Sequence, residues 1–178
     1  MNRPAAASPS STRVIAIDPS LRGTGYAILE KAGARLRAVE YGVIKNADKL
    51  LPSSCLVAIH DRLAELVHKH APDCGAVEGV IFVQSHRIAI TLGAARGAAI
   101  LALAERGLPV YEYAPRRIKQ AVVGRGAAAK SQVAFMVRAR LGLTETPPAD
   151  AADALAIGMT HFQTQETASH GAAVLQRI

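Results

Sequence analysis

Apolar runs separated by turn residues predict that the chain begins with three antiparallel strands. The first run starts at Val14 and ends at Asp18, and Gly- and Thr-containing turn residues separate it from a second run over residues 26–29. β-Branched residues favour strands, and glycine in the intervening segment favours a hairpin. Residues 35–44 alternate roughly between apolar and polar side chains, which is typical of a third strand. Asp18 is therefore expected at the rim of the first hairpin.

The rest of the chain alternates predicted helices and strands. Apolar residues recur three and four positions apart in the helical segments, whereas the strands are short apolar runs. The predicted segments are helices over 55–70, 87–106, a short stretch from Pro115, 130–141 and 150–162, with strands over 74–82 and 108–113. A helix between two strands predicts a parallel βαβ unit. The fold class is α/β: a five-stranded mixed sheet flanked by helices, with strands 1–3 antiparallel and strands 1, 4 and 5 parallel.

Length and local composition predict a single domain over residues 13–163. The 178 residues are enough to bury a core. Residues 1–12 lack the apolar centre of a signal peptide and are expected to form a disordered tail, and residues 164–178 a flexible one. The sequence has no uninterrupted apolar run of about 18 residues, so no membrane span is predicted. Two cysteines without zinc-site spacing fit a reduced, cytoplasmic setting.

The charge distribution points to a polyanionic partner. The formal net charge is +7, and residues 114–143 hold basic side chains without any acidic one. These basic residues are Arg116, Arg117, Lys119, Arg125, Lys130, Arg138 and Arg140. A block of one sign is either a solvated face or a surface for phosphate contacts.

Four acidic residues stand at the ends of predicted elements. Asp18 and Glu78 each end an apolar strand, while Asp150 and Asp153 share one face of the first turn of the last helix. Each alone has a simpler explanation, as a turn residue or as a complement to the helix dipole. Together they match a phosphoryl-transfer site for two divalent ions, since Mg²⁺ and Mn²⁺ prefer oxygen ligands.

The motifs, taken in order, resemble those of the RuvC family of Holliday-junction resolvases, which have a ribonuclease-H-like fold. The resemblance covers residues 13 to 162. The motifs are Ile17-Asp18-Pro19 with Thr24-Gly25-Tyr26, Ala76-Val77-Glu78, Leu92-Gly93 with Ala95-Arg96-Gly97, Tyr111 to Ala114 with Lys119-Gln120 and Val122 to Gly124, Lys130 to Val133, and Ala149 to Ala156. Any one of these motifs alone would be weak evidence for the family, but their order and spacing together are specific to it.

The resemblance implies roles for individual residues. Asp18, Glu78, Asp150 and Asp153 would be the catalytic acids that bind two Mg²⁺ (or Mn²⁺) ions. Lys119 and Lys130 would lie near the scissile phosphate and the junction backbone. Phe82 would offer a stacking surface at the opened junction centre. Further contacts with DNA are expected from the arginines Arg87, Arg116, Arg117 and Arg125.

The implied activity is endonucleolytic resolution of four-way DNA junctions during recombination and repair. Paired cuts in two equivalent strands imply a two-fold homodimer, and the family implies the RuvA–RuvB branch-migration complex as a partner. The small-residue surface of the helix over 87–106 is a candidate dimer contact. Two rival hypotheses remain: a nucleotide-binding kinase or ATPase lobe of the actin-like class, which also begins with a strand, an Asp and a Gly/Thr hairpin, and a junction-binding protein that does not cut.

Overall fold

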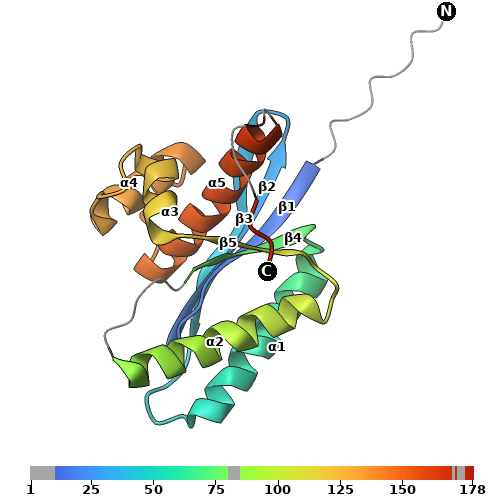
Figure 1. Ribbon diagram of the computed structural model, residues 1–178, viewed down its shortest axis with the longest axis vertical. Helices are drawn as coiled ribbons and strands as arrows, with labels where there is room; N and C mark the ends of the chain where they lie inside the picture. Colours follow the sequence, from blue (N-terminus) through green and yellow to red (C-terminus); the bar gives the residue numbers. More distant parts are fainter. Residues whose placement is uncertain (1–10, 80–84, 170, 172–174) are drawn as a thin grey trace, which may run out of the picture.

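The computed structural model describes residues 11–79, 85–169, 171 and 175–178, and its centre is a five-stranded sheet (Figure 1). The strands lie in the order β3-β2-β1-β4-β5. Their bounds are Ser11–Asp18 for β1, Gly23–Ala32 for β2, Arg35–Lys45 for β3, Cys74–Glu78 for β4 and Val110–Tyr113 for β5. β2 is antiparallel to β1 and β3, whereas β4 is parallel to β1 and β5. The predicted mixed sheet is confirmed.

Helices of the described chain cover both faces of this sheet. They are α1 (Pro52–His70), α2 (His86–Ala104), α3 (Pro115–Val123), α4 (Lys130–Leu141) and α5 (Ala149–Ser169). α1 and α2 lie on one face and α3, α4 and α5 on the other (Figure 1). Alternate side chains of β1 divide between the two layers: Ile15 and Ile17 join the cluster on the α1 and α2 side, and Val14 and Ala16 join the other. This alternation is typical of a strand buried on both faces.

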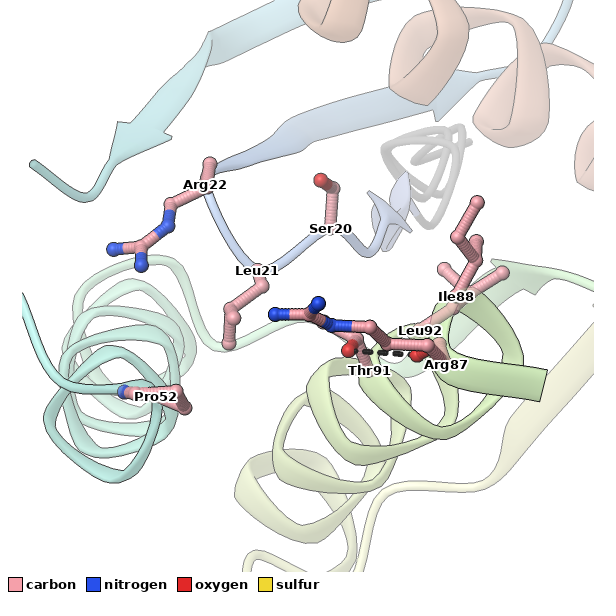
Figure 2. A pocket seen from close by; sticks show the side chains of 8 residues that line it. All are labelled: Ser20, Leu21, Arg22, Pro52, Arg87, Ile88, Thr91 and Leu92. Carbon is pink, nitrogen blue, oxygen red and sulfur yellow. Dashed lines mark hydrogen bonds between the residues drawn. The ribbon is translucent and has the colours of Figure 1, made fainter. Parts of the chain in front are cut away.

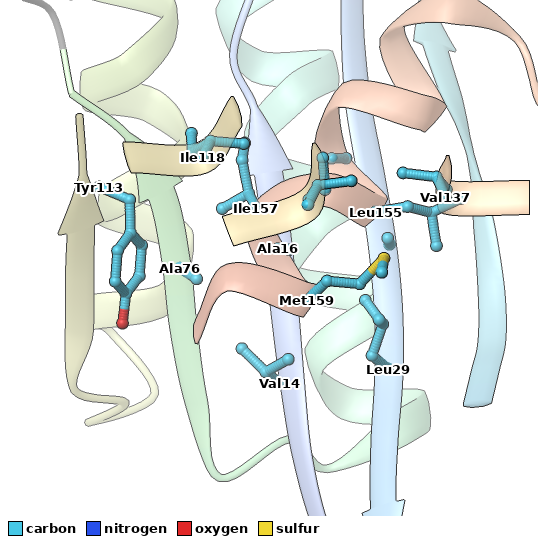
Figure 3. Packing of buried hydrophobic residues seen from close by; sticks show 14 of the residues in the cluster. Val14, Ala16, Leu29, Ala76, Tyr113, Ile118, Val137, Leu155, Ile157 and Met159 are labelled. Carbon is cyan, nitrogen blue, oxygen red and sulfur yellow. The ribbon is translucent and has the colours of Figure 1, made fainter. Parts of the chain in front are cut away.

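α5 lies closely against the sheet and contributes much of one core layer (Figure 3). Leu155, Ile157 and Met159 are buried among strand and helix side chains. Gly158 permits the close approach, because a Cβ at this position would lie 2.4 Å from Leu29 Cδ1 of β2. The height of α5 above β1 and β2 is therefore fixed by packing, and this fixes where its first turn lies.

Some element ends differ from the predicted ones. α5 ends at Ser169 rather than near residue 162, because the buried hydroxyls of Thr160 and Thr164 donate to carbonyls four residues earlier and so need no water. β1 begins at Ser11, inside the segment predicted as a tail, and the backbone of residues 176–178 pairs with β5. Residues 1–10 lie outside the described residues, and the division into one domain and two tails stays a prediction.

By length and composition alone, α2 could cross a membrane. Its most apolar window is 22% buried. Ala95, Ala99 and Leu103 nevertheless pack into the core layer beside α1, and Arg96 interrupts the apolar sequence near the middle of the helix. The packing of α2 in the core and the charge of Arg96 therefore argue against a membrane span, and the exposed apolar side chains of α2 need another explanation.

Candidate active site

Asp18 and Glu78 occupy neighbouring strand ends. β1 and β4 are parallel, and their register pairs Ile17 with Val77. The next residue of each strand is one of the two acids, and each of these acids is the last residue of its strand. Carboxyl ends of adjacent parallel strands open at the same edge of a sheet. The structure therefore brings these two predicted site residues to one edge.

The first turn of α5 is packed against this edge through two glycines. Gly25 pairs in register with Asp18, and a Cβ on Gly25 would lie 2.0 Å from the backbone oxygen of Asp150. A Cβ on Gly23 would lie 2.8 Å from Asp150 Oδ2. Glycine lets another backbone approach this closely. Asp150, and with it Asp153 one turn further along α5, is thereby held beside the Asp18 hairpin.

Burial and neighbouring negative charges raise the pKa values of Asp18 and Glu78. The pKa of Asp18 rises from 3.8 to about 7, first through burial and then through the negative charges of Glu78, Asp153 and Asp150, while Lys130 opposes the shift. Burial and then Asp153 raise the pKa of Glu78. The acids are thus close enough to interact, and a cation among them would relieve the repulsion.

Two lysines share a cavity with two of the acids. A hollow of about 220 Å³ is lined by Glu78, Asp153, Lys119 and Lys130, with apolar side chains from α3, α4 and α5. Lys130 Nζ donates a hydrogen bond to Asp153 Oδ2 at 3.0 Å, and this bond raises the pKa of Lys130. Both lysines partly oppose the rise in the pKa of Glu78. Positive charge therefore stands where a phosphate could meet the acids.

The donor atoms fit Mg²⁺ or Mn²⁺, but the side chains are not arranged as a ready-made metal centre. Carboxylate oxygens are the ligands that these hard cations prefer. Within the described ranges, however, no group of three or more His, Cys, Asp or Glu side chains is gathered so that it could hold an ion. Like charges repel, and Asp153 is engaged by Lys130. Metal binding at this edge would therefore require the acids to turn towards a shared ion.

Arg87 lies in a different and larger hollow, of about 450 Å³, between the first hairpin, α1 and α2 (Figure 2). Ser20 and Arg22 of the hairpin also line it. The guanidinium group of Arg22 is held in place, because it donates to the carbonyl oxygens of Ala47 and Leu50 at 2.6 and 3.0 Å. Ser20 and Arg22 are not among the residues predicted to bind DNA, although their position just after Asp18 was an available signal.

The remaining predicted DNA-binding residues divide into two groups. Arg116 and Arg117 on α3, and Arg125 in the loop after it, are exposed. Their side chains extend the positive charge of the lysine-lined cavity along the surface of α3. Phe82 lies outside the described residues, so its predicted stacking role stays a prediction.

Several known proteins resemble this chain over most of its length. The family model described as "Crossover junction endodeoxyribonuclease RuvC" matches residues 14–161. The crossover junction endodeoxyribonuclease RuvC of Akkermansia muciniphila is 55% identical over 150 residues, which cover 84% of this chain and 90% of the relative. That of Pelotomaculum thermopropionicum is 44% identical over 149 residues, covering 83% and 91%.

Solved structures also include proteins that resemble this chain over most of its length. RuvC of T. thermophilus in complex with a Holliday junction substrate matches with a TM-score of 0.84 and 36% identity, over 94% of this chain and 99% of that one. The yeast mitochondrial resolvase Ydc2 matches with a TM-score of 0.65 over 94% and 86%, and its 13% identity shows the fold alone. The predicted ribonuclease-H-like fold and endonuclease class are confirmed, and the two rival hypotheses find no support in these matches. This chain belongs to the RuvC family of crossover junction endodeoxyribonucleases.

Proposed function

We propose that this chain resolves four-way DNA junctions by metal-dependent hydrolysis, with Asp18, Glu78, Asp150 and Asp153 as its metal-binding and catalytic residues. The observation that carries the assignment is the convergence of two strand ends and the first turn of α5. Their carboxylates are near enough together that burial and mutual repulsion raise the pKa of Asp18 to about 7. Buried acids with perturbed pKa values are typical of catalytic sites.

The chemistry follows from the donor set. When bound, two divalent ions supply an activated water and stabilise the leaving oxygen of a phosphodiester. Asp18 has to release its proton before it can act as a ligand. Lys130, which donates a hydrogen bond to Asp153 in the metal-free protein, is placed to donate to the phosphate instead once that carboxylate faces a metal ion. Lys119, in the same cavity, is placed to neutralise phosphate charge.

The exposed arginines of α3 and the following loop are proposed to hold the DNA backbone beyond the scissile phosphate. Arg116, Arg117 and Arg125 belong to a segment that holds no acidic residue between 114 and 143. Contacts of this kind position the duplex without reading its sequence. Arg87, beside the hairpin hollow, is proposed as a separate phosphate contact on the α2 side of the site.

We also propose that the chain acts as a homodimer through α2. Ile90, Ala94, Gly97 and Leu101 are exposed and recur at intervals of four, three and four residues, so they share one face of the helix. Ile90 and Leu101 are 73% and 51% exposed. Small residues between two larger apolar ones permit close helix contact, and a second copy of the same face is self-complementary across a two-fold axis. Such a dimer supplies the two sites that paired cuts require.

By family resemblance, we further propose a cytoplasmic location and contact with the RuvA–RuvB branch-migration complex. The relatives described above are bacterial proteins of the same family. A net charge of +7 favours a nucleic-acid partner.

Incubation with a synthetic four-way junction tests the proposed function directly. The expected result is two symmetric nicks in Mg²⁺ or Mn²⁺, none when a chelator is present, and little cutting of a linear duplex that carries the same sequence. Equal cutting of junction and duplex would contradict structure selectivity. Cutting that persists with chelator would contradict the metal requirement.

A further inference from the structure

A polar network lies in the core beneath the candidate active site. His161 of α5 is fully buried. Its Nδ1 atom hydrogen-bonds with the Tyr113 hydroxyl of β5 at 2.8 Å, and its Nε2 atom lies 3.2 Å from the sulfur of Cys74 on β4. The Tyr113 and His161 rings also meet edge to face, with centroids 5.9 Å apart. One imidazole therefore joins the three elements.

The network is neutral at physiological pH. Burial lowers the pKa of His161 to about 4 and raises the pKa of Cys74 to about 12, and burial also raises the pKa of Tyr113. A neutral imidazole has one donor nitrogen and one acceptor nitrogen. Each ring nitrogen can thus bond one neighbour without a buried charge, and loss of a neighbour would leave a buried nitrogen unpaired.

The ends of this network lead to the proposed metal ligands. Tyr113 pairs in register with Glu78, and its backbone carbonyl accepts a hydrogen bond from Gly79 N at 2.9 Å. The Tyr113 side chain, in contrast, reaches His161 on the helix that carries Asp153. One residue is therefore bonded to the end of the Glu78 strand through its backbone and to the aspartate helix through its hydroxyl.

The end of β4 is also held by contacts from α2 and β5. Arg96 of α2 forms an ion pair with Glu112 of β5 and lies 3.5 Å, through Nε, from the backbone oxygen of Glu78. Gly79 packs on Glu112, whose carboxylate carbon would lie 3.1 Å from a Cβ added there. Because the end of β4 is fixed from this side, a displacement of α5 changes the distance between Glu78 and the aspartates.

We propose that Tyr113 and His161 are positioning residues that set the separation between Glu78 on β4 and the aspartates Asp150 and Asp153 on α5, and so tune affinity for the divalent ions. The proposal rests on the proposed assignment of these acids as metal ligands. If the network served stability alone, its disruption would lower the unfolding temperature but leave the metal affinity of the folded protein unchanged.

The test compares Tyr113→Phe with Thr160→Val. Both remove one buried hydroxyl whose hydrogen bond is 2.8 Å long, but Thr160 bonds to Ala156 within α5 and joins no second element. Mn²⁺ affinity is measured by calorimetry without DNA, and stability by thermal unfolding in chelator. Tyr113→Phe is expected to weaken Mn²⁺ binding about tenfold, at the lower end of effects seen when groups that orient metal ligands are removed. Thr160→Val is expected to lower stability without changing Mn²⁺ affinity.

His161→Gln provides a second variant, because an amide can still bond one of the two neighbours. It is expected to weaken Mn²⁺ binding less than Tyr113→Phe combined with His161→Phe. Wild-type Mn²⁺ affinity in folded Tyr113→Phe and His161→Gln would overturn the positioning role. Glu78→Gln distinguishes failure of the positioning role from failure of the ligand assignment. If Glu78→Gln also bound Mn²⁺ like the wild type, the proposed assignment of Glu78 as a ligand would be wrong.

Discussion

At the scale of single residues, the charge on Asp18 is unfavourable in the folded, metal-free protein. The pKa of its carboxyl is raised from 3.8 to about 7 by burial and by three neighbouring acids. Such a group binds its proton more tightly in the folded state than in the unfolded state. Asp18 therefore opposes folding once it is ionised, which is the pattern expected of a residue retained for its chemistry rather than for stability.

Asp18→Asn is expected to stabilise the metal-free protein. The free-energy cost of folding with Asp18 ionised is small near pH 4, grows as the pH rises to about 7 and is constant above that. These limits are the pKa values of Asp18 in the unfolded state, 3.8, and in the folded state, about 7. Asparagine removes the charge, so the gain at about pH 8 is expected to be roughly 2 to 4 kcal/mol. Denaturant unfolding in chelator at low and high pH measures it. A gain that does not depend on pH would contradict this account.

The same proton predicts how the metal requirement depends on pH. Below about pH 7, protons compete with Mg²⁺ for Asp18, so the Mg²⁺ concentration for half-maximal cleavage is expected to rise roughly tenfold for each pH unit lost. Lys130 lowers the pKa of Asp18, and Lys130→Gln is therefore expected to move this dependence to higher pH. Single-turnover cleavage at constant ionic strength measures both. An Mg²⁺ requirement that is the same on either side of pH 7 would exclude Asp18 as the competing group.

At the scale of secondary-structure elements, the site depends on how closely the first turn of α5 approaches the β1–β2 hairpin. Gly25 faces the backbone oxygen of Asp150, and a Cβ there would lie only 2.0 Å from it. Gly23 leaves room for the Asp150 carboxylate. Neither glycine has a positive φ, so close approach, and not backbone conformation, explains why a side chain is excluded at Gly25.

Gly25→Ala is expected to push the first turn of α5 away from Asp18. The overpacking should cost roughly 1 to 3 kcal/mol of stability, and a displacement of about 1 Å at a catalytic group should lower the cleavage rate about 100-fold. Gly42→Ala is the matched control, because a Cβ at Gly42 would also overpack, 2.8 Å from the Tyr26 hydroxyl oxygen, but on the α1 and α2 side of the sheet. Single-turnover cleavage and thermal unfolding are compared for the two variants. Wild-type cleavage by Gly25→Ala would show that the approach of α5 does not matter for the site.

Some of these features could be predicted from local sequence signals, and others could not. Asp18 and Glu78 follow apolar strands, and Asp150 and Asp153 share a helical turn, so each acid is marked by its immediate neighbours. The bond between Tyr113 and His161 joins residues 48 positions apart and exists only once α5 lies on the sheet. The pattern of apolar and polar positions does not indicate such a pair.

The end of α5 shows the same limit. Residues beyond 162 are mostly polar in sequence and suggested a tail, yet the helix continues to Ser169. Threonine hydroxyls bond back to the helix backbone, which lets Thr160 and Thr164 remain buried at 0% and 4% exposure. Polarity alone therefore placed the helix end too early, because side-chain hydrogen bonds within a helix are not visible as a pattern.

At the scale of the whole molecule, the exposed apolar face of α2 is proposed to contact a second copy of the chain. Leu101→Glu is expected to give monomers, because a carboxylate in an apolar helix contact loses its water. Val57→Glu is the control, since Val57 is similarly exposed, at 58%, on the neighbouring helix α1. Sedimentation velocity over a range of concentrations measures the assembly. A Leu101→Glu variant that still forms dimers, or a wild-type chain that is monomeric throughout, would contradict an α2 interface.

Acids from β1, β4 and the start of α5 are proposed to form one metal-dependent cleavage site. Asp150→Asn tests this proposal, because the substitution removes one charge from α5 while keeping the side-chain shape. Single-turnover cleavage of a four-way junction in Mg²⁺ is measured beside junction binding in chelator. Asp150→Asn is expected to abolish cleavage and to retain junction binding. Cleavage at the wild-type rate by this variant would contradict the proposed site.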